Sequence, residues 1–197
     1  MDQEPEELKE EEAMVASCVD AERFAEVFER RAREIYRYLS CRTGSDLAEE
    51  LTAETFARAF AARQRFDPRR GSVRAWLYGI ATNVVRNQYR SERRKRSAYA
   101  REVGLRAVRP SSEGADNGLA ERAQLETALA HLDRRSQDVL YLLVAVGLTY
   151  EETATALGIP VGTVRSRYSR AKAQMAELLG AKASRTRNGH PTEERPS

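Results

Sequence analysis

The chain has 197 residues, which is enough for one ordinary domain or two small ones. Hydrophobic residues make up 41% and charged residues 32%, a balance that suits globular helical modules. The two cysteines, Cys18 and Cys41, are too few for a disulfide framework and fit a reducing, cytoplasmic setting. The acidic amino terminus does not resemble a signal peptide, and no apolar run approaches the roughly 20 residues of a membrane helix. We therefore expect no export and no membrane insertion.

The formal net charge of +3 conceals a strong segregation of charge along the chain. Residues 1–12 carry seven acidic side chains against one lysine, whereas residues 63–109 carry fourteen basic side chains against three acidic ones. A second basic block, residues 165–187, has seven basic side chains and one acidic. Two separated basic blocks favour two contacts with a polyanion such as nucleic acid, and the alternative is two solvated helix faces.

Apolar residues at helical spacing predict a three-helix unit over residues 20–95. Asp46, with Glu49 three residues later, is expected to cap the second helix. The turn at 66–71, Phe-Asp-Pro-Arg-Arg-Gly, separates the second helix from the third. The three apolar stripes are Phe24, Val27, Phe28, Ile35, Tyr38 and Leu39; Leu47, Leu51, Thr55, Ala59 and Phe60; and Val73, Trp76, Leu77, Ile80 and Val84.

A second helical unit is predicted over residues 119–179. The stretch before it, 96–118, begins with basic residues and ends in turn formers, which indicates a flexible linker. The polar tail at 180–197 is expected to be disordered. The predicted fold is therefore all-α, with two small helical domains joined by a flexible linker.

Residues 150–170 have the pattern of a helix-turn-helix. Thr149 and Glu152 can form a capping box, and Gly158 can take the left-handed conformation between the two helices. Ala154 is small enough for a close crossing, and Val164 can pack the second helix onto the first. The second helix could then enter a major groove of DNA, and the alternative is a helical hairpin that binds none.

Two segments resemble a known family when they are read together. Residues 147–167, from Gly-Leu-Thr-Tyr-Glu-Glu to Gly-Ile-Pro-Val-Gly-Thr-Val-Arg-Ser-Arg, resemble region 4 of sigma-70 proteins. Residues 46–56 and 65–81 resemble region 2 of the same family. Because nothing of domain size separates the two, the resemblance points to the extracytoplasmic-function group of sigma factors. It implies a subunit that binds the β and β′ subunits of core RNA polymerase, recognises minus-thirty-five and minus-ten promoter elements, and promotes DNA melting.

The resemblance also assigns polymerase-binding residues on the helix that follows Asp46. In the family this helix docks on the β′ clamp helices, and its acids suit a basic partner. The alternative is an exposed acidic face without a partner. The implied residues are Glu49, Glu50, Leu51, Glu54 and Phe56.

The minus-ten site implied by the resemblance lies on the turn at 66–71 and the helix after it. Phe66 would stack on an unstacked base, and the Asn83 amide offers both a donor and an acceptor to a base edge. Thr82 departs from the Arg that relatives commonly carry, and Trp76 fits core packing better than DNA stacking. The basic residues expected to hold phosphates are Arg86, Arg90, Arg93 and Arg94.

The minus-thirty-five site follows from helix geometry together with the resemblance. At about 100° per residue, Val164, Tyr168, Ala171 and Met175 form the buried face of the last helix. The opposite face would meet the DNA, with arginines gripping guanine and the flanks holding phosphate. Its residues are Gly162, Thr163, Arg165, Ser166, Arg167, Ser169, Arg170 and Lys172.

We expect no chemistry from the chain itself: no cofactor, no metal and no small-molecule substrate. His131 and His190 are isolated, and no phosphate loop or catalytic constellation is present in the sequence. Many relatives are held inactive by an anti-sigma factor, and we expect the same control here. The alternatives are a dimeric helix-turn-helix regulator that acts without polymerase, and an enzyme with an appended DNA-binding domain.

Overall fold

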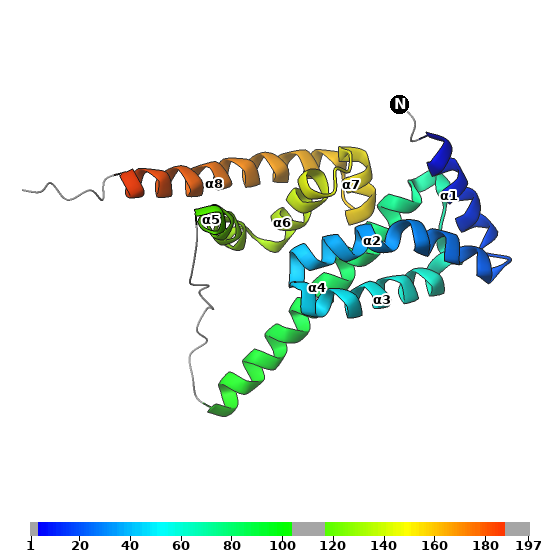
Figure 1. The fold of residues 1–197 in the computed structure, drawn as a ribbon, viewed down its shortest axis with the longest axis horizontal. Helices are drawn as coiled ribbons and strands as arrows, with labels where there is room; N and C mark the ends of the chain where they lie inside the picture. Colours follow the sequence, from blue (N-terminus) through cyan, green and yellow to red (C-terminus); the bar gives the residue numbers. More distant parts are fainter. Residues whose placement is uncertain (1–3, 104–116, 188–197) are drawn as a thin grey trace, which may run out of the picture.

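The computed structural model describes residues 4–103 and 117–187, and every regular element in these two ranges is helical. The all-α prediction is confirmed there. The first bundle contains α1 (Glu4–Ala16), η1 (Ala21–Arg23), α2 (Phe24–Thr43), α3 (Ser45–Ala62), η2 (Arg63–Arg65), η3 (Pro68–Arg70) and α4 (Val73–Val103). The second contains α5 (Asn117–His131), α6 (Arg134–Leu140), the π-helical turn η4 (Tyr141–Ala145), α7 (Tyr150–Leu157) and α8 (Val161–Arg187) (Figure 1).

Helices α2, α3 and α4 form the main core of the first bundle, as their apolar stripes predict. Leu39 and Leu77 are fully buried in this core. Phe28 differs from expectation, because its side chain remains 44% exposed while its ring contacts Phe56 edge to face. The predicted cap of α3 is wrong: the helix starts at Ser45 after Gly44, whose φ of 84° makes the turn, without a side-chain cap.

Helix α1 was not predicted, although its Glu, Leu and Lys residues all favour a helix. It packs on the first bundle through Met14, which is fully buried. Beside it the buried Glu10 carboxylate accepts two hydrogen bonds from Arg31, at 2.8 and 2.6 Å. Two adjacent apolar residues, Ala13 and Met14, and a charged pair thus fix α1, and this leaves only a faint apolar stripe in the sequence.

Two helices run further than the domain boundaries expected from the sequence. Helix α4 continues to Val103, and its second half projects away from the other helices (Figure 1). Arg, Lys, Ala and Glu favour a helix in this second half, and after Gly79 the next glycine comes only at residue 104. Helix α8 continues through Gly180 to Arg187, and the Ala, Lys and Arg residues after this glycine again favour a helix. The rest of the expected linker and tail, 104–116 and 188–197, lies outside the described residues.

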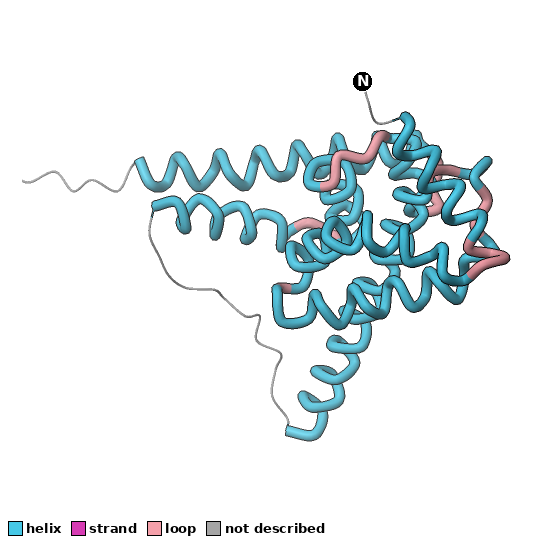
Figure 2. Tube along the Cα trace, turned by 45° about the vertical axis from the view of Figure 1, so that its right-hand side comes forward, coloured by secondary structure: helices cyan, strands magenta, loops and turns pink. Residues whose placement is uncertain are grey.

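In the second bundle, α5 and α8 lie side by side (Figures 1 and 2), joined by a small apolar cluster around Leu132 and Met175. The helix-turn-helix has its own cluster, in which Val164 packs against Ala154. The predicted capping box is confirmed, since Thr149 and Glu152 exchange both of its hydrogen bonds. Gly158 takes the predicted left-handed conformation, with φ 63° and ψ 39°.

The two bundles are in contact, and we call this contact the junction. It brings α2 and α4 of the first bundle against α6, η4 and α7 of the second. Leu142 and Leu148 belong to the second bundle but are buried in the core of the first. None of the helices in the described ranges is both long and apolar enough to cross a membrane.

Candidate nucleic-acid and polymerase interfaces

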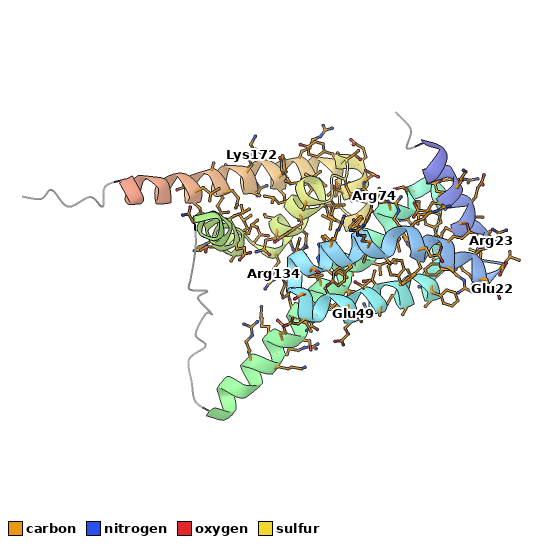
Figure 3. All side chains as sticks on the ribbon, viewed as in Figure 1. Glu22, Arg23, Glu49, Arg74, Arg134 and Lys172 are labelled. Atoms are coloured by element: carbon orange, nitrogen blue, oxygen red, sulfur yellow. The ribbon has the colours of Figure 1, made fainter. Side chains whose placement is uncertain are left out.

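The outer face of α8 carries the polar residues predicted for duplex DNA. Val164, Ala171 and Met175 are buried beneath it, as the helix geometry requires. Figure 3 shows Lys172 on the side of α8 turned away from α5. Thr163 and Arg167 are half-buried at the edges of this face. The exposed residues are Gly162, Arg165, Ser166, Ser169, Arg170 and Lys172.

Arg165 is partly held by the neighbouring helix α7. Its guanidinium carbon lies 5.5 Å from the centre of the Tyr150 ring, and its Nη2 lies 3.7 Å from Glu151 Oε1. Both contacts are on the surface, so each contributes little to stability. Their effect is to bias the direction of a long side chain that remains 65% exposed.

A hollow between α6 and α8 adds two arginines that sequence reasoning missed. Arg134 and Arg135 line it together with Arg167 and Arg170. Asp133 caps α6 by accepting bonds from the backbone of Arg135 and Ser136, at 2.8 and 2.9 Å. Burial alone would raise the pKa of the Asp133 carboxyl, but these bonds and the Ser136 hydroxyl lower it. The signal was the Arg-Arg pair directly after a capping residue.

The turn before α4 forms a second hollow, in which Phe66 and Trp76 meet edge to face with ring centres 5.5 Å apart. Arg65, Asp67, Arg70 and Gly71 also line it, and Thr155 of α7 forms another wall. Trp76 is half-buried and packs against the core, as expected. Its ring edge nevertheless lines the hollow. An apolar floor with arginines around it suits a base and its phosphate.

The predicted minus-ten residues are not all brought together. Asn83, Arg90, Arg93 and Arg94 are exposed along α4, but none of them lines the hollow beside Phe66. Arg86 is engaged inside the chain, where its Nε donates to Asp138 Oδ2 at 2.8 Å.

Thr82 has a structural explanation. Its side chain is buried, and its hydroxyl shares a 2.8 Å hydrogen bond with the Tyr38 hydroxyl. Tyr38 in turn accepts from Arg42 at 3.0 Å. Burial raises the pKa of Tyr38, so its hydroxyl remains protonated. Residue 82 therefore faces the junction side of α4 rather than solvent.

The outer face of α3 contains the acids predicted for polymerase. Glu49 and Glu50 are exposed, and Figure 3 places Glu49 on α3. Glu54 is half-buried and bonded to Arg58 at 2.5 Å. Leu51 and Phe56 are buried, at 3% and 4% exposure, so they support the helix and offer no surface to a partner.

No cluster of three or more His, Cys, Asp or Glu that could hold a metal occurs among the residues that the structure describes. His131 is exposed, and its Nδ1 is 2.7 Å from the Thr127 carbonyl oxygen. His190 lies outside the described residues.

Two family models match the chain. The model described as sigma-70 region 2 matches residues 27–95, within the first bundle. The model described as sigma-70 region 4 matches residues 122–175, within the second.

Named relatives agree with both matches. The sigma factor SigC of Mycobacterium tuberculosis, described as an ECF RNA polymerase sigma factor, is 33% identical over 144 residues, covering 71% of this chain and 74% of the relative. The sigma factor CnrH of Cupriavidus metallidurans is 32% identical, with coverage of 68% and 73%.

Solved structures show the same fold. Sigma factor RpoE of Bartonella quintana, in complex with the anti-sigma factor NepR, matches with a TM-score of 0.58 and 26% identity, covering 80% of this chain and 96% of that one. CnrH in complex with the cytosolic domain of CnrY matches with a TM-score of 0.63 and 24% identity, covering 89% and 97%.

Proposed function

The chain belongs to the sigma-70 family, in its extracytoplasmic-function group, and we propose that three of its surfaces direct core RNA polymerase to promoters. The observation that carries the proposal is the presence, in one chain, of an open acidic face on α3 and an open basic face on α8. The first surface suits a protein partner and the second suits DNA. Members of this family are transcription initiation factors, and such a subunit works where the chromosome lies, at the nucleoid.

We assign α8 to the minus-thirty-five element. Arg165 and Arg170 stand beside Ser166 and Ser169 on its exposed face, where arginine can reach a guanine edge through two hydrogen bonds. Arg135, in the hollow beside α8, lies on the same side as Arg167 and adds positive charge for the phosphate backbone.

We assign the hollow beside Phe66 and the exposed side of α4 to the minus-ten element. Phe66 and Trp76 form an apolar floor for an unstacked base, and Asn83 offers an amide to a base edge. The arginines along the projecting half of α4 would then hold the phosphates that follow. Trapping extruded bases favours melting without any chemistry by the chain, since polymerase supplies the active site.

We assign the exposed acids Glu49 and Glu50 to the β′ subunit of core polymerase, and the second bundle to the β subunit. Because Leu51 and Phe56 are buried, their role is to hold α3 in position. We further propose control by an anti-sigma factor, because the similar sigma factor RpoE is seen in complex with the anti-sigma factor NepR.

Run-off transcription with bacterial core polymerase on genomic fragments tests this function. We expect new start sites only when the chain is added, and protection of two DNA segments only when core polymerase is present. A dimeric regulator would instead protect one symmetric operator without polymerase, and that result would contradict the proposal. A chain with its own enzymatic activity would turn over a substrate in the absence of polymerase.

A further inference from the structure

The turn that carries Phe66 is held by the end of α1. Arg63 is the first residue of η2, and its carbonyl oxygen accepts a hydrogen bond from the Phe66 amide at 3.1 Å. Its side chain reaches back to α1, where Arg63 Nε donates to the Ser17 carbonyl oxygen at 2.9 Å. The Cys18 sulfur lies 3.5 Å from the Arg63 carbonyl oxygen. We call these contacts of Arg63 with Ser17 and Cys18 the α1 clamp.

The Arg63 side chain is engaged inside the chain rather than open to DNA. Its Nη1 donates to the Phe60 carbonyl oxygen at 2.8 Å, and its guanidinium carbon lies 4.0 Å from the centre of the Phe60 ring. Carbonyl groups at the end of a helix have no partner inside it and carry partial negative charge, so an arginine suits this position. Arg63 does not line the hollow beside Phe66. It can influence that hollow only through the turn.

The other side of the clamp is firmly seated. Met14, in the last turn of α1, is fully buried, and so is Ser17, whose hydroxyl donates to the Met14 carbonyl oxygen at 2.6 Å. The bonded pair of Glu10 and Arg31 fixes the middle of the helix. Figure 1 shows α1 at the end of the first bundle opposite to the projecting half of α4. The end of α1 is therefore a fixed support for η2.

The turn itself has little burial of its own. Phe66 and Gly71 are half-buried, whereas residues 67–70 between them are all exposed. The Phe66 ring packs against Trp76, with ring centres 5.5 Å apart. Support from outside the turn thus matters for the direction of Phe66. That support comes from a segment before residue 27, where the match to sigma-70 region 2 begins.

We propose that α1 positions the minus-ten site: the α1 clamp fixes the start of the turn and so holds Phe66 where it can stack on an unstacked base. Arg63 is a positioning residue, which acts through Phe66. The inference rests on the proposed function for the identity of the site. The clamp itself belongs to the free chain and can be measured without DNA or polymerase.

Two variants release the turn from opposite sides. Met14→Ala unseats the end of α1, and Arg63→Met removes the guanidinium but keeps an apolar stem. In the free chain, hydrogen exchange of the Phe66 amide reports the bond to Arg63. Acrylamide quenching of Trp76, the single tryptophan, reports access to the hollow. We expect faster exchange and stronger quenching in both variants, at a temperature where circular dichroism shows each to be folded.

Two matched controls separate positioning from a general loss of stability. Met14→Leu keeps a similar apolar volume and should restore the parent values. Leu39→Ala removes a fully buried side chain at the other end of α2. Phe24, which contacts Phe60 beside the clamp, lies about 22 Å from Leu39 along this helix at about 1.5 Å per residue. Leu39→Ala should therefore leave Phe66 exchange and Trp76 quenching at the parent values.

The consequence is measured with reconstituted holoenzyme on a promoter found by run-off transcription. If a released turn holds Phe66 in place in one chain of five, open-complex formation on duplex DNA should fall about five-fold. The loss should be smaller on a template already melted across the minus-ten element. Phe66→Ala should lose at least as much. The double variant Met14→Ala with Arg63→Met should lose no more than the weaker single variant, because both break the same support.

Parent-like exchange and quenching in both folded variants would overturn the clamp. If Met14→Ala does not fold, Arg63→Met decides alone. A salt dependence lowered by about one in Arg63→Met would show that Arg63 holds a phosphate, and would also overturn the positioning role. So would a released turn with parent-like transcription, provided that Phe66→Ala is impaired. Parent-like transcription by Phe66→Ala would instead contradict the proposed minus-ten site, and the positioning role would fall with it.

Discussion

The junction and the outer face of α3 both carry charge, and they use it in opposite ways. At the junction the Asp138 carboxylate has no exposure and is bonded by two arginines. On α3, Glu49 and Glu50 are exposed, and the Glu54–Arg58 pair is about two-fifths exposed on each side. The first arrangement satisfies charge inside the chain, whereas the second leaves charge available to a partner.

The difference separates charges that are bonded inside the chain from charges that are open to a partner. A buried charge without its partner is strongly unfavourable, so the junction charges permit one arrangement of the bundles. Burial alone would lower the pKa of Arg42, but Tyr38 and Asp138 outweigh it and raise the pKa, so this guanidinium stays charged. Exposed charges are screened and permit many arrangements, which suits the surface that we propose binds polymerase.

The largest effect should come from removing the buried carboxylate. Asp138→Ala leaves Arg42 without its ionic partner, which should cost about 3–5 kcal/mol in the free energy of unfolding. Native-state hydrogen exchange should report it as a loss of protection in α6 and α7. The matched control is Glu54→Ala, which breaks the exposed pair on α3 and should cost about 0.3–0.5 kcal/mol. Equal losses in the two variants would erase the contrast between buried and exposed charge.

The next effect concerns a third set of charges, on α8. Arg165→Ala and Arg170→Ala should each lose roughly 1–3 kcal/mol of discrimination between minus-thirty-five variants. Lys172→Ala should weaken all variants alike and lower the salt dependence of binding. Titration of mutated promoter sequences with reconstituted holoenzyme, at two salt concentrations, separates these outcomes. Uniform losses for both arginine variants would show that they hold the backbone without reading bases.

The sequence alone predicts the features that depend on residues close together in the chain. The Thr149–Glu152 capping box, the left-handed Gly158 and the buried face of α8 all follow from residues a few positions apart. The junction could not be predicted in this way. Arg42 and Asp138 are 96 residues apart, and nothing near either one indicates its partner. Arg86 was therefore interpreted as a phosphate contact, although in the structure it bonds to Asp138.

Burial explains the other positions at which the structure differs from what the sequence predicts. Leu51 and Phe56 lie on the predicted docking helix but point into its core, because the helix period places them on the apolar stripe. Helix α1 is not predicted because two adjacent buried residues, Ala13 and Met14, and one ion pair fix it, without a stripe of apolar residues at helical spacing.

A smaller effect is expected from Asp133, the exposed residue that caps the start of α6. Asp133→Ala removes an N-cap that bonds two backbone amides and should cost about 1 kcal/mol in the free energy of unfolding. The pKa of Asp133 is lowered on folding, so its contribution is present above the unfolded pKa. It is lost as the pH falls through the lower, folded pKa. Parent and variant should therefore differ in denaturant midpoint at neutral pH and converge in acid, and a constant difference would contradict the assignment.

The smallest effect on stability should come from the face that we assign to polymerase. Reversing Glu49 and Glu50 to Lys changes two exposed side chains, so the free energy of unfolding should move by no more than about 0.5 kcal/mol. Affinity for core polymerase should nevertheless fall, because like charges would then face a basic partner. The matched control reverses Glu22 and Glu29, two exposed acids elsewhere on the first bundle, and should bind core polymerase as the parent does. Binding is measured by pull-down at two salt concentrations. If the α3 variant binds as tightly as the control, the exposed acids of α3 are a solvated face and polymerase docks elsewhere.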